Sequence, residues 1–334
     1  MFVKLTKKLV LVLVLVAIAT IFSGNIFAAA QFAGESMAIG VGARPLGMGG
    51  TFAGIADDAS TSYWNPAGMT NINGVEVSSV KLTKINDLDT KYSYVNLVYN
   101  TGTIGAFGLG WLRQAIGGII ITPDAINIIN DSAENADNVI YLAYAYPVMK
   151  GLSVGLGGKI MLGNYPNFTS TGTQATVNYS GGGLDLGVFF SAGEFLSALK
   201  GLQLGLTLQD VFTQITWDTG ITEKTEKVDI NAKPGIAYKL AIGQFEITPA
   251  IDIDTKYQII FHGGLEVWWN KMFALRGGIK IWGGLPNGTT IETLTQAMDW
   301  SMGASVRWYF IGIDYAYVNN ELTPTQYLSI VGKF

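Results

Sequence analysis

GARPLGMGGTFAGIADDASTSYWNPAG, residues 42–68, is the stretch that decides the fold. It is rich in glycine and other small residues, so its backbone can adopt positive φ and approach neighbouring chains closely. It shows neither the period of an amphipathic helix nor the alternation of a strand. A long series of alternating strands with no second hydrophobic core follows it. This arrangement predicts a hatch, a compact segment that fills the lumen of a barrel.

Within this stretch, residues 56–63 predict a short helix, with Asp57 or Asp58 near its N-terminus, where a carboxylate caps free N–H groups. Asn65-Pro66 is expected to end that helix. Asn65 is expected to hydrogen-bond nearby backbone, as asparagine does in turns. The glycines at 47–50 do not indicate a nucleotide loop, because no buried strand precedes them and no Gly-Lys-Ser/Thr follows.

The same stretch, with the strands that follow it, resembles the PorV/PorQ family of outer-membrane proteins, which is similar in fold to the FadL transporters of long-chain fatty acids. The residues that carry this resemblance are Arg44, Gly47, Met48, Gly49, Gly50, Asp57, Asp58, Trp64, Asn65, Pro66 and Ala67. The resemblance implies an all-β fold, a 14-stranded antiparallel transmembrane β-barrel with an N-terminal hatch in its lumen, located in the bacterial outer membrane.

The resemblance also implies two alternative functions. In the first, a FadL-like barrel takes up small hydrophobic compounds across the outer membrane. In the second, a PorV-like accessory barrel is a binding platform for a secreted protein or for secretion machinery of the type IX kind, or acts in envelope assembly. The sequence leaves both alternatives open, and neither is an enzymatic activity.

Composition supports a membrane barrel. Only 14% of the 334 residues are charged, well under the roughly 25% of soluble domains, and there are 42 glycines. After the N-terminus no run of about 18 apolar residues occurs, which leaves a closed barrel as the membrane architecture. The net charge of -4 offers no basic field for nucleic acid, and the absence of cysteine excludes disulfides and cysteine metal sites.

The N-terminus predicts export. Lys4, Lys7 and Lys8 precede an apolar run over residues 9–22, and small residues follow at 28–30. This pattern is typical of a secretory signal peptide, with an N-terminal membrane anchor as the alternative. We therefore expect a signal peptide at 1–28, a hatch at 29–74 and a barrel at 75–334.

From Val75 onward the hydrophobic period is two. Leu156 and Leu206, for example, fall on an apolar face, while Gly157 and Thr207 fall on the other face. The fourteen predicted strands are 75–84, 90–100, 103–113, 138–147, 151–162, 181–191, 201–211, 231–241, 244–253, 257–269, 272–282, 297–308, 310–318 and 325–334.

Short connections alternate with longer ones, which is typical of an outer-membrane barrel with short periplasmic turns. Both termini are expected on the periplasmic side, so that the hatch enters from there. The terminal Phe334 resembles the signal read by barrel-insertion machinery. Aromatic residues near strand ends predict girdles in contact with outer-membrane lipid: Tyr92, Tyr99, Trp111, Tyr141, Tyr146, Trp268, Trp269, Trp282, Trp308 and Tyr309.

Charged residues within the strands fall on the face opposite the leucines and predict a polar network in the lumen. Its members are Lys159, Asp185, His262, Glu266, Arg276, Lys280, Asp299 and Arg307, with Glu246, Asp252 and Asp314 on the same face. The turn at 270–271 predicts that residue 266 lies opposite 276 and residue 262 opposite 280. We interpret the network as ion pairs that brace the wall and hold the hatch, with ion conduction or catalysis as the alternative.

The sequence indicates no catalytic residue, metal site or cofactor. His262 is the one histidine of the chain, and no serine or cysteine motif accompanies it.

Two irregular features carry alternatives. The loop predicted at 114–137 is apolar, with Ile116, Ile119, Ile120, Ile121, Ile126, Ile128 and Ile129. It is either a landing surface for a hydrophobic molecule or partner, or an outward extension of the preceding strand. Pro249 cannot donate a ladder hydrogen bond, so it marks either a lateral gap in the wall or a bulge.

Overall fold

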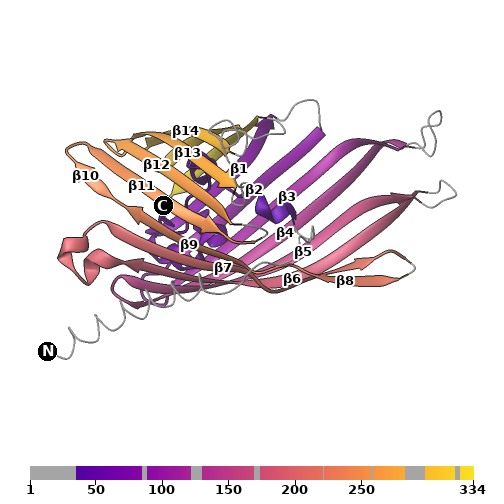
Figure 1. Cartoon of the computed structure of the whole chain (residues 1–334), viewed down its shortest axis with the longest axis horizontal. Coiled ribbons are helices and arrows are strands. Elements are labelled where there is room, and N and C mark those ends of the chain that lie inside the picture. Colours follow the sequence, from indigo (N-terminus) through magenta and orange to yellow (C-terminus); the bar gives the residue numbers. More distant parts are fainter. Residues whose placement is uncertain are drawn as a thin grey trace, which may run out of the picture.

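The computed structural model describes residues 35–84, 89–121, 130–168, 174–220, 222–256, 259–282, 298–319 and 324–334. Antiparallel strands run side by side around a barrel (Figure 1). The predicted signal peptide at 1–28 lies outside the described residues. Within the described ranges, no helix has the length and apolar character needed to cross a membrane.

The strands pair with their neighbours in chain order. Their bounds are β1 Gly74–Lys84, β2 Asp89–Asn100, β3 Ala106–Ile121, β4 Asn130–Met149, β5 Leu152–Phe168, β6 Gln174–Ser191, β7 Leu202–Asp218, β8 Glu223–Lys227, β9 Asn231–Tyr238, β10 Leu240–Ile242, β11 Phe245–Asp254, β12 Ile260–Trp269, β13 Phe273–Trp282, β14 Met298–Trp308, β15 Ile311–Asn319 and β16 Thr325–Lys333.

These segments form a closed barrel of fourteen strands, as the sequence predicts. β8, β9 and β10 are successive pieces of one strand, because β8 and β9 both pair with β7, and β9 and β10 both pair with β11. Pairing of β16 with β1 closes the sheet.

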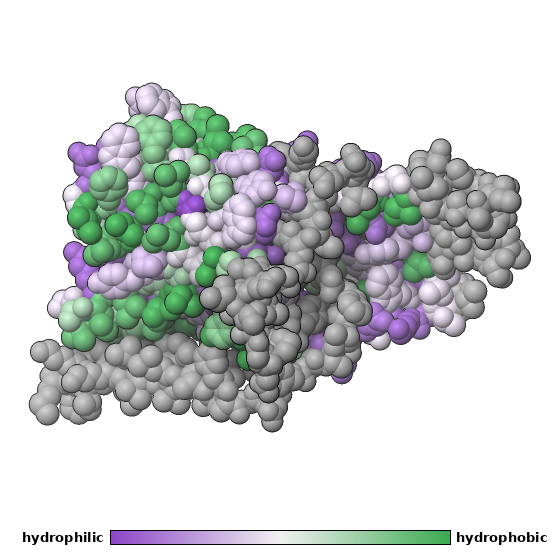
Figure 2. All heavy atoms as spheres, turned by 45° about the horizontal axis from the view of Figure 1, so that its top comes forward, coloured by the Kyte–Doolittle hydropathy of each residue, from purple (hydrophilic) through white to green (hydrophobic). Residues whose placement is uncertain are grey.

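The two faces of the wall follow the predicted alternation. On β5, Leu156 and Ile160 are each 47% exposed on the outside, while Lys159 between them is buried. Figure 2 shows apolar residues gathered over the short strands on the left. An apolar outside with polar groups inside is the arrangement of a barrel that spans a lipid bilayer.

The strands differ in length around the barrel. Strands β3 to β7, which we call the tall wall, have 16 to 20 residues each. Strands β11 to β16, which we call the short wall, have 9 to 11. The tall wall extends to the right in Figure 1, beyond the short wall in orange and yellow.

The loop predicted at 114–137 is mostly strand in the tall wall, as the alternative of an outward extension predicts. β3 continues to Ile121 and β4 begins at Asn130, with Ile116 opposite Asn135 and Ile119 opposite Ala133. Isoleucine favours strands because its β-branched side chain fits a pleated surface, so the isoleucine run extends β3 outward. Ile126, Ile128 and Ile129 lie outside the described residues.

The N-terminal segment from Glu35 to the start of β1 lies inside the lumen. It contains η1 Glu35–Ala38, α2 Ala43–Leu46, α3 Thr61–Trp64 and η2 Pro66–Asn71. The helix predicted at 56–63 is wrong, because α3 has four residues and its N-cap Ser60 makes no side-chain cap. Asp57 does not cap it, since its carboxylate binds Arg44. Asp58 binds Arg44 as well, but its Oδ1 also accepts the amide of Ser60 at 2.9 Å, directly before α3.

The side from which this segment enters the barrel is decided by residues before Glu35, which lie outside the described residues. Met37 and Ala38 line a cavity together with Lys280 and Trp282, at the end of β13 that lies away from the Asn270 turn. From there the segment descends through the lumen to β1, on the turn side. Its first described residues therefore face the outer half of the lumen.

Inward-facing glycines make room for the hatch backbone. A Cβ atom on Gly205 would overlap the carbonyl of Ala53, and one on Gly278 would overlap the amide of Gly49. Further wall glycines that a Cβ would bring against hatch atoms within 3.1 Å are Gly108, Gly155, Gly187, Gly235 and Gly264. Glycine is needed here because it alone permits such close backbone approach.

At Pro249 the wall keeps its register. Pairing with β12 is unbroken, with Pro249 opposite Leu265. On the other side, pairs stop at Ala250 with Ala237 and resume at Ile247 with Leu240, without a register shift. The strands therefore stay adjacent. Instead of a lateral gap, the wall has a break of two residues, Thr248 and Pro249, in the ladder on one side of β11.

Four of the predicted girdle residues face the lumen instead of lipid. Tyr92 and Tyr141 are buried, Trp282 lines a cavity, and the ring of Trp268 lies 5.3 Å from the guanidinium of Arg276. Strand alternation places them inward, since closeness to a strand end does not decide the face. The other six are exposed: Tyr99, Trp111, Tyr146, Trp269, Trp308 and Tyr309.

Candidate functional site

Arg44 is the centre of the contact between the hatch and the short wall. Its Nε donates to Oε2 of Glu266 on β12, and its Nη2 donates to Oε1 of the same carboxylate, both at 2.7 Å. Its Nη1 donates to Asp57 at 2.6 Å and to Asp58 at 3.1 Å. Bidentate pairing of this kind fixes both the position and the orientation of a guanidinium. The hatch is thereby held against β12.

The ion pairs continue from Glu266 across the short wall. Arg276 on β13 lies 2.6 Å from Glu266, and Arg307 on β14 lies 2.8 Å from Asp314 on β15. Arg276 and Asp314 approach to 3.7 Å, and Ser305 hydrogen-bonds both. A chain of buried charges thus connects the hatch to four strands.

The charges at the hatch end of this chain are held ionised. Burial favours the neutral form of the Asp57 carboxyl, but Arg44 and Lys239 outweigh it and lower the pKa of Asp57 below its usual value. Burial also opposes the charge on Arg44, yet Asp57 and Glu266 raise the pKa of the guanidinium above its ordinary value. The contact is therefore a true ion pair.

Single side chains of the short wall also hold the hatch backbone. Asp252 accepts the amides of Phe52 and Ala53 at 2.7 and 2.8 Å. Ser301 accepts the amide of Gly49 at 2.9 Å. The Nδ1 atom of His262 lies 2.6 Å from the carbonyl oxygen of Gly49. His262 is thus a positioning residue in the described structure.

Asn65 connects the hatch to the tall wall. Its Oδ1 accepts the amide of Ala67 at 3.2 Å, the local bond that turn chemistry predicts, and its Nδ2 donates to the carbonyls of Ala53 and Val188 at 3.0 Å. The hydroxyl of Thr207 on β7 donates to the carbonyl of Trp64. The tall wall therefore binds the hatch mostly through backbone atoms and uncharged groups.

The remaining motif residues pack in the interior. Met48 is completely buried, and Trp64 Nε1 donates to the carbonyl of Val41 at 2.8 Å. Gly47 approaches Gly303 on β14 closely, and Gly50 lies beside the His262 ring. Pro66 opens η2 at its first turn, and Ala67 packs with Phe189.

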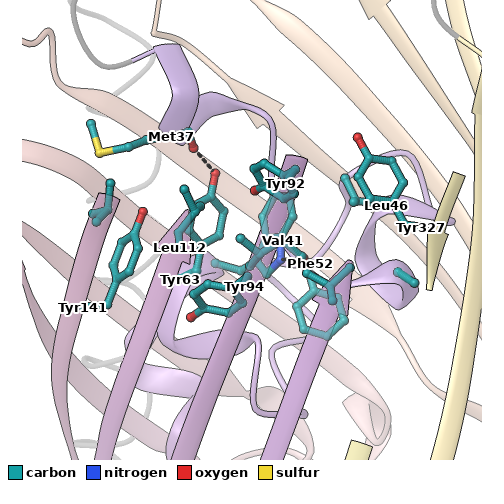
Figure 3. Close-up of a cluster of buried hydrophobic side chains, with 14 of the residues drawn as sticks. Met37, Val41, Leu46, Phe52, Tyr63, Tyr92, Tyr94, Leu112, Tyr141 and Tyr327 are labelled. Carbon is teal, nitrogen blue, oxygen red and sulfur yellow. Dashed lines mark hydrogen bonds between the residues drawn. The ribbon is translucent and has the colours of Figure 1, made fainter. Parts of the chain in front are cut away.

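An aromatic layer covers the outer side of the hatch (Figure 3). Tyr63 lies 5.9 Å from Tyr141 and 5.0 Å from Trp64, edge to face in both pairs. The Tyr63 hydroxyl donates to the carbonyl of Met37 (Figure 3). The Tyr92 hydroxyl donates to the carbonyl of Gly40. Edge-to-face packing of rings adds stability beyond their buried area. The layer fixes the floor of the outer lumen.

Two cavities of about 210 and 230 Å³ lie above this floor. They share Ala38, Lys233, Asp254 and Lys280, so they adjoin one another. The first is lined further by aromatic and charged side chains: Tyr63, Tyr141, Trp282, Lys159, Asp185, Asp210 and Lys256. The second includes Trp64, Trp300, Tyr327, His262 and Asp299. Aromatic rings and charges thus meet in one space.

The predicted lumen network divides into three groups. Glu266, Arg276 and Arg307 belong to the chain of ion pairs around Arg44. Lys159 binds Asp185 at 2.8 Å and also binds Asp210. Lys280, Asp299 and His262 line the second cavity. The predicted pairs 266 with 276 and 262 with 280 are confirmed.

The sequence analysis did not predict several charged residues of the site. Lys256 binds Asp210 at 2.8 Å, and Lys233 binds Asp254 at 3.0 Å. The alternation of β9 could have placed Lys233 inward. Asp210 could not be placed, because it lies at a bulge with φ of 63° where β7 loses its period. In the described ranges, no group of three or more histidine, aspartate or glutamate side chains could hold a metal ion.

Comparison with solved structures identifies proteins of similar fold. No protein-family model matches the sequence, and no curated protein matches it. Solved structures do match: the monoaromatic hydrocarbon channel CymD has a TM-score of 0.60 at 15% identity, covering 89% of this chain and 98% of that one. The Ralstonia pickettii toluene transporter TbuX has a TM-score of 0.56 at 14% identity, covering 88% and 98%.

A Pseudomonas aeruginosa FadL homologue is similar as well, with a TM-score of 0.54 at 12% identity, covering 87% of this chain and 97% of that one. At these identities the likeness establishes the fold. The chain has the 14-stranded barrel architecture of FadL-like outer-membrane proteins.

Proposed function

We propose that this protein is a bacterial outer-membrane barrel that takes up small hydrophobic compounds. The observation that carries the proposal is the pair of adjoining cavities on the outer side of a lumen that the hatch fills. A cavity of about 150 Å³ suffices for benzene, so each cavity has room for a monoaromatic molecule. Of the structurally similar proteins, CymD is a monoaromatic hydrocarbon channel and TbuX is a toluene transporter.

The division into a hatch at 29–74 and a barrel at 75–334 is part of this proposal. The hatch closes the lumen to free passage of water, so a ligand reaches the cavities from outside and displaces side chains to proceed. The protein binds and transfers its ligand, and the proposal includes no chemical step. Its partners are the surrounding lipid, the hydrophobic ligand and the insertion machinery that reads Phe334.

The test is accumulation of radiolabelled toluene, at low external concentration, by intact cells that express the full chain. Ala38 lines both cavities, so Ala38→Trp should fill them and reduce the initial rate at least fivefold. Ala198→Trp, at an exposed position of the short 3₁₀ helix η4 Ser197–Leu199, is the matched control and should leave the rate unchanged. Equal rates in the two variants, with equal amounts of folded barrel, would refute the role of the cavities.

We infer the PorV/PorQ-type platform as the alternative function. It is favoured by the outer surface of the tall wall, where ion pairs continue beyond the apolar belt: Arg113 lies 2.9 Å from Glu134, and Lys91 lies 3.6 Å from it. A polar wall that rises above the bilayer offers a surface to a secreted protein. Recovery of a secreted protein with the purified barrel, together with unchanged toluene uptake on its expression, would favour this alternative.

A further inference from the structure

The first cavity carries an excess of positive charge. Four lysines line it, Lys159, Lys233, Lys256 and Lys280, against the three aspartates Asp185, Asp210 and Asp254. Charges in a cleft with low-dielectric walls act over the whole cleft. Asp299 in the adjoining second cavity balances the total charge of the two, so the excess is local to the first cavity. An anionic ligand would be attracted there, whereas a bare hydrocarbon would not.

The excess charge is located at one residue. Lys159 lies 2.8 Å from Asp185, Lys256 lies 2.8 Å from Asp210, and Lys233 lies 3.0 Å from Asp254.

For Lys280, the described part of the chain supplies no carboxylate oxygen within 4.0 Å. Its ammonium lies 4.1 Å from the centroid of the Trp282 ring, a contact that leaves its hydrogen-bond donors available. Asp299 lies opposite Lys280 in the ladder, and Asp254 lines the same cavities, but both are beyond ion-pair distance. Lys280 lines both cavities and stands where they adjoin.

A second polar group faces the first cavity from the tall wall. The Tyr141 residue is 3% exposed, and its hydroxyl has no hydrogen-bond partner among the described residues. An unpaired buried hydroxyl costs free energy until something accepts its hydrogen bond. A ligand acceptor group in this cavity would take hydrogen bonds from Tyr141 and from Lys280.

Apolar surface lies beside these donors. The rings of Tyr63 and Trp282, with Met37 and Ile260, give the first cavity its apolar surface, and the side chains of Gln209 and Asn231 line it as well. We propose that Lys280 determines specificity, and that the barrel selects small aromatic compounds that carry an anionic group, such as a carboxylate, over bare hydrocarbons of the same size. This proposal rests on the proposed uptake function and narrows its ligand class.

The physical basis is the cost of enclosing an unpaired ammonium. A neutral ring in the cavity would remove water from Lys280 and offer only a cation–π contact in exchange, whereas a carboxylate would replace that water with a charge-assisted hydrogen bond. Such bonds contribute more than neutral ones. We therefore expect at least tenfold tighter binding of an aromatic carboxylate than of its neutral counterpart.

The experiment is calorimetric titration of the purified full chain in detergent at pH 7 with benzoate, benzyl alcohol and toluene. Lys280→Met keeps the length of the side chain and removes its charge, so it should abolish the preference for benzoate. Lys280→Arg should retain it. Lys200→Met, at an exposed turn position, is the control. Heat-modified gel migration checks that each variant is a folded barrel.

Three outcomes are decisive. Preferential binding of benzoate that is lost in Lys280→Met and kept in Lys280→Arg supports the proposal. Toluene or benzyl alcohol binding as tightly as benzoate to the unchanged chain overturns the anionic specificity and leaves hydrophobic uptake standing. Tighter benzoate binding that persists in Lys280→Met shows that another cation is responsible and overturns the role of Lys280.

Discussion

The tall wall and the short wall hold the same hatch by different chemistry. The short wall offers charged side chains, with Glu266 and Asp252 as the principal acceptors. The tall wall offers close-lying glycines and uncharged hydrogen bonds, as at Gly205 and Thr207. Paired charges fix the orientation of the hatch, whereas close backbone contact requires that the hatch and the wall have complementary shapes. The hatch is therefore oriented by one wall and fitted against the other.

This division does not continue in the outer lumen, because the tall wall contributes the charged residues Lys159, Asp185 and Asp210 to the first cavity. Inward side chains of the upper tall wall are mainly aromatic or apolar: Tyr165, Tyr179 and Trp217 lie within 6.1 Å of one another, and Met161 and Ile215 are buried nearby. The short wall contributes Lys280, Asp299 and His262 to its cavity. The short wall also contributes the rings of Trp282, Trp300 and Tyr327, so a ligand between the walls would meet rings and charges on both sides.

The largest expected effect comes from breaking the charged contact on the short wall. Glu266→Gln leaves Arg44 and Arg276 facing one another, and removing one partner of a buried ion pair costs about 3–5 kcal/mol. We expect a loss of about 3 kcal/mol in the free energy of unfolding, measured by urea titration in lipid vesicles.

Glu194→Gln is the control on the tall-wall side, since Glu194 pairs with an exposed Lys150 at 2.9 Å. Such surface pairs contribute at most about 1 kcal/mol. If both variants unfold at the same urea concentration, charge on the short wall does not hold the hatch.

The second effect tests where the tall wall leaves the bilayer. Leu156 and Asn164 share the outer face of β5, and the exposed apolar residues of that strand end at Leu162. An arginine on the lipid face costs about 2–4 kcal/mol at the bilayer midplane and about 0–1 kcal/mol near its edge. Leu156→Arg should therefore greatly reduce barrel insertion into liposomes, while Asn164→Arg should insert normally. Equal loss in both variants would place the whole tall wall in lipid.

The sequence predicted the strands and their register better than the contacts of the side chains in the lumen. Alternation with period two placed Lys159 and Leu156 correctly, and the turn at Asn270 fixed the register of Glu266 with Arg276. The turn residues Asn270 and Lys271 both have positive φ, as a two-residue hairpin turn requires, so the local sequence determines the geometry of this connection.

Features that depend on bulges or on distant contacts could not be predicted. Asp210 turns inward through a bulge that shifts the register of β7. Asp57 looks like a helix cap in sequence, but its carboxylate binds Arg44, thirteen residues away. Local propensity is overridden in both places by a tertiary partner, and both places belong to the candidate site.

The smallest effect compares two adjacent glycines of β13. A Cβ on Gly278 would overlap the amide of Gly49, whereas one on Gly277, which points outward, would meet nothing within 4 Å. Overpacking costs about 1–3 kcal/mol, so Gly278→Ala should displace the hatch from the wall. It should also raise the conductance of the barrel in planar bilayers, because the lumen is filled by the hatch. Gly277→Ala should leave conductance unchanged and slightly stabilise the strand, since glycine is the weaker strand former. Unchanged conductance and stability in Gly278→Ala would mean that the short wall tolerates a hatch shifted by a methyl group, and that its ion pairs alone set the fit.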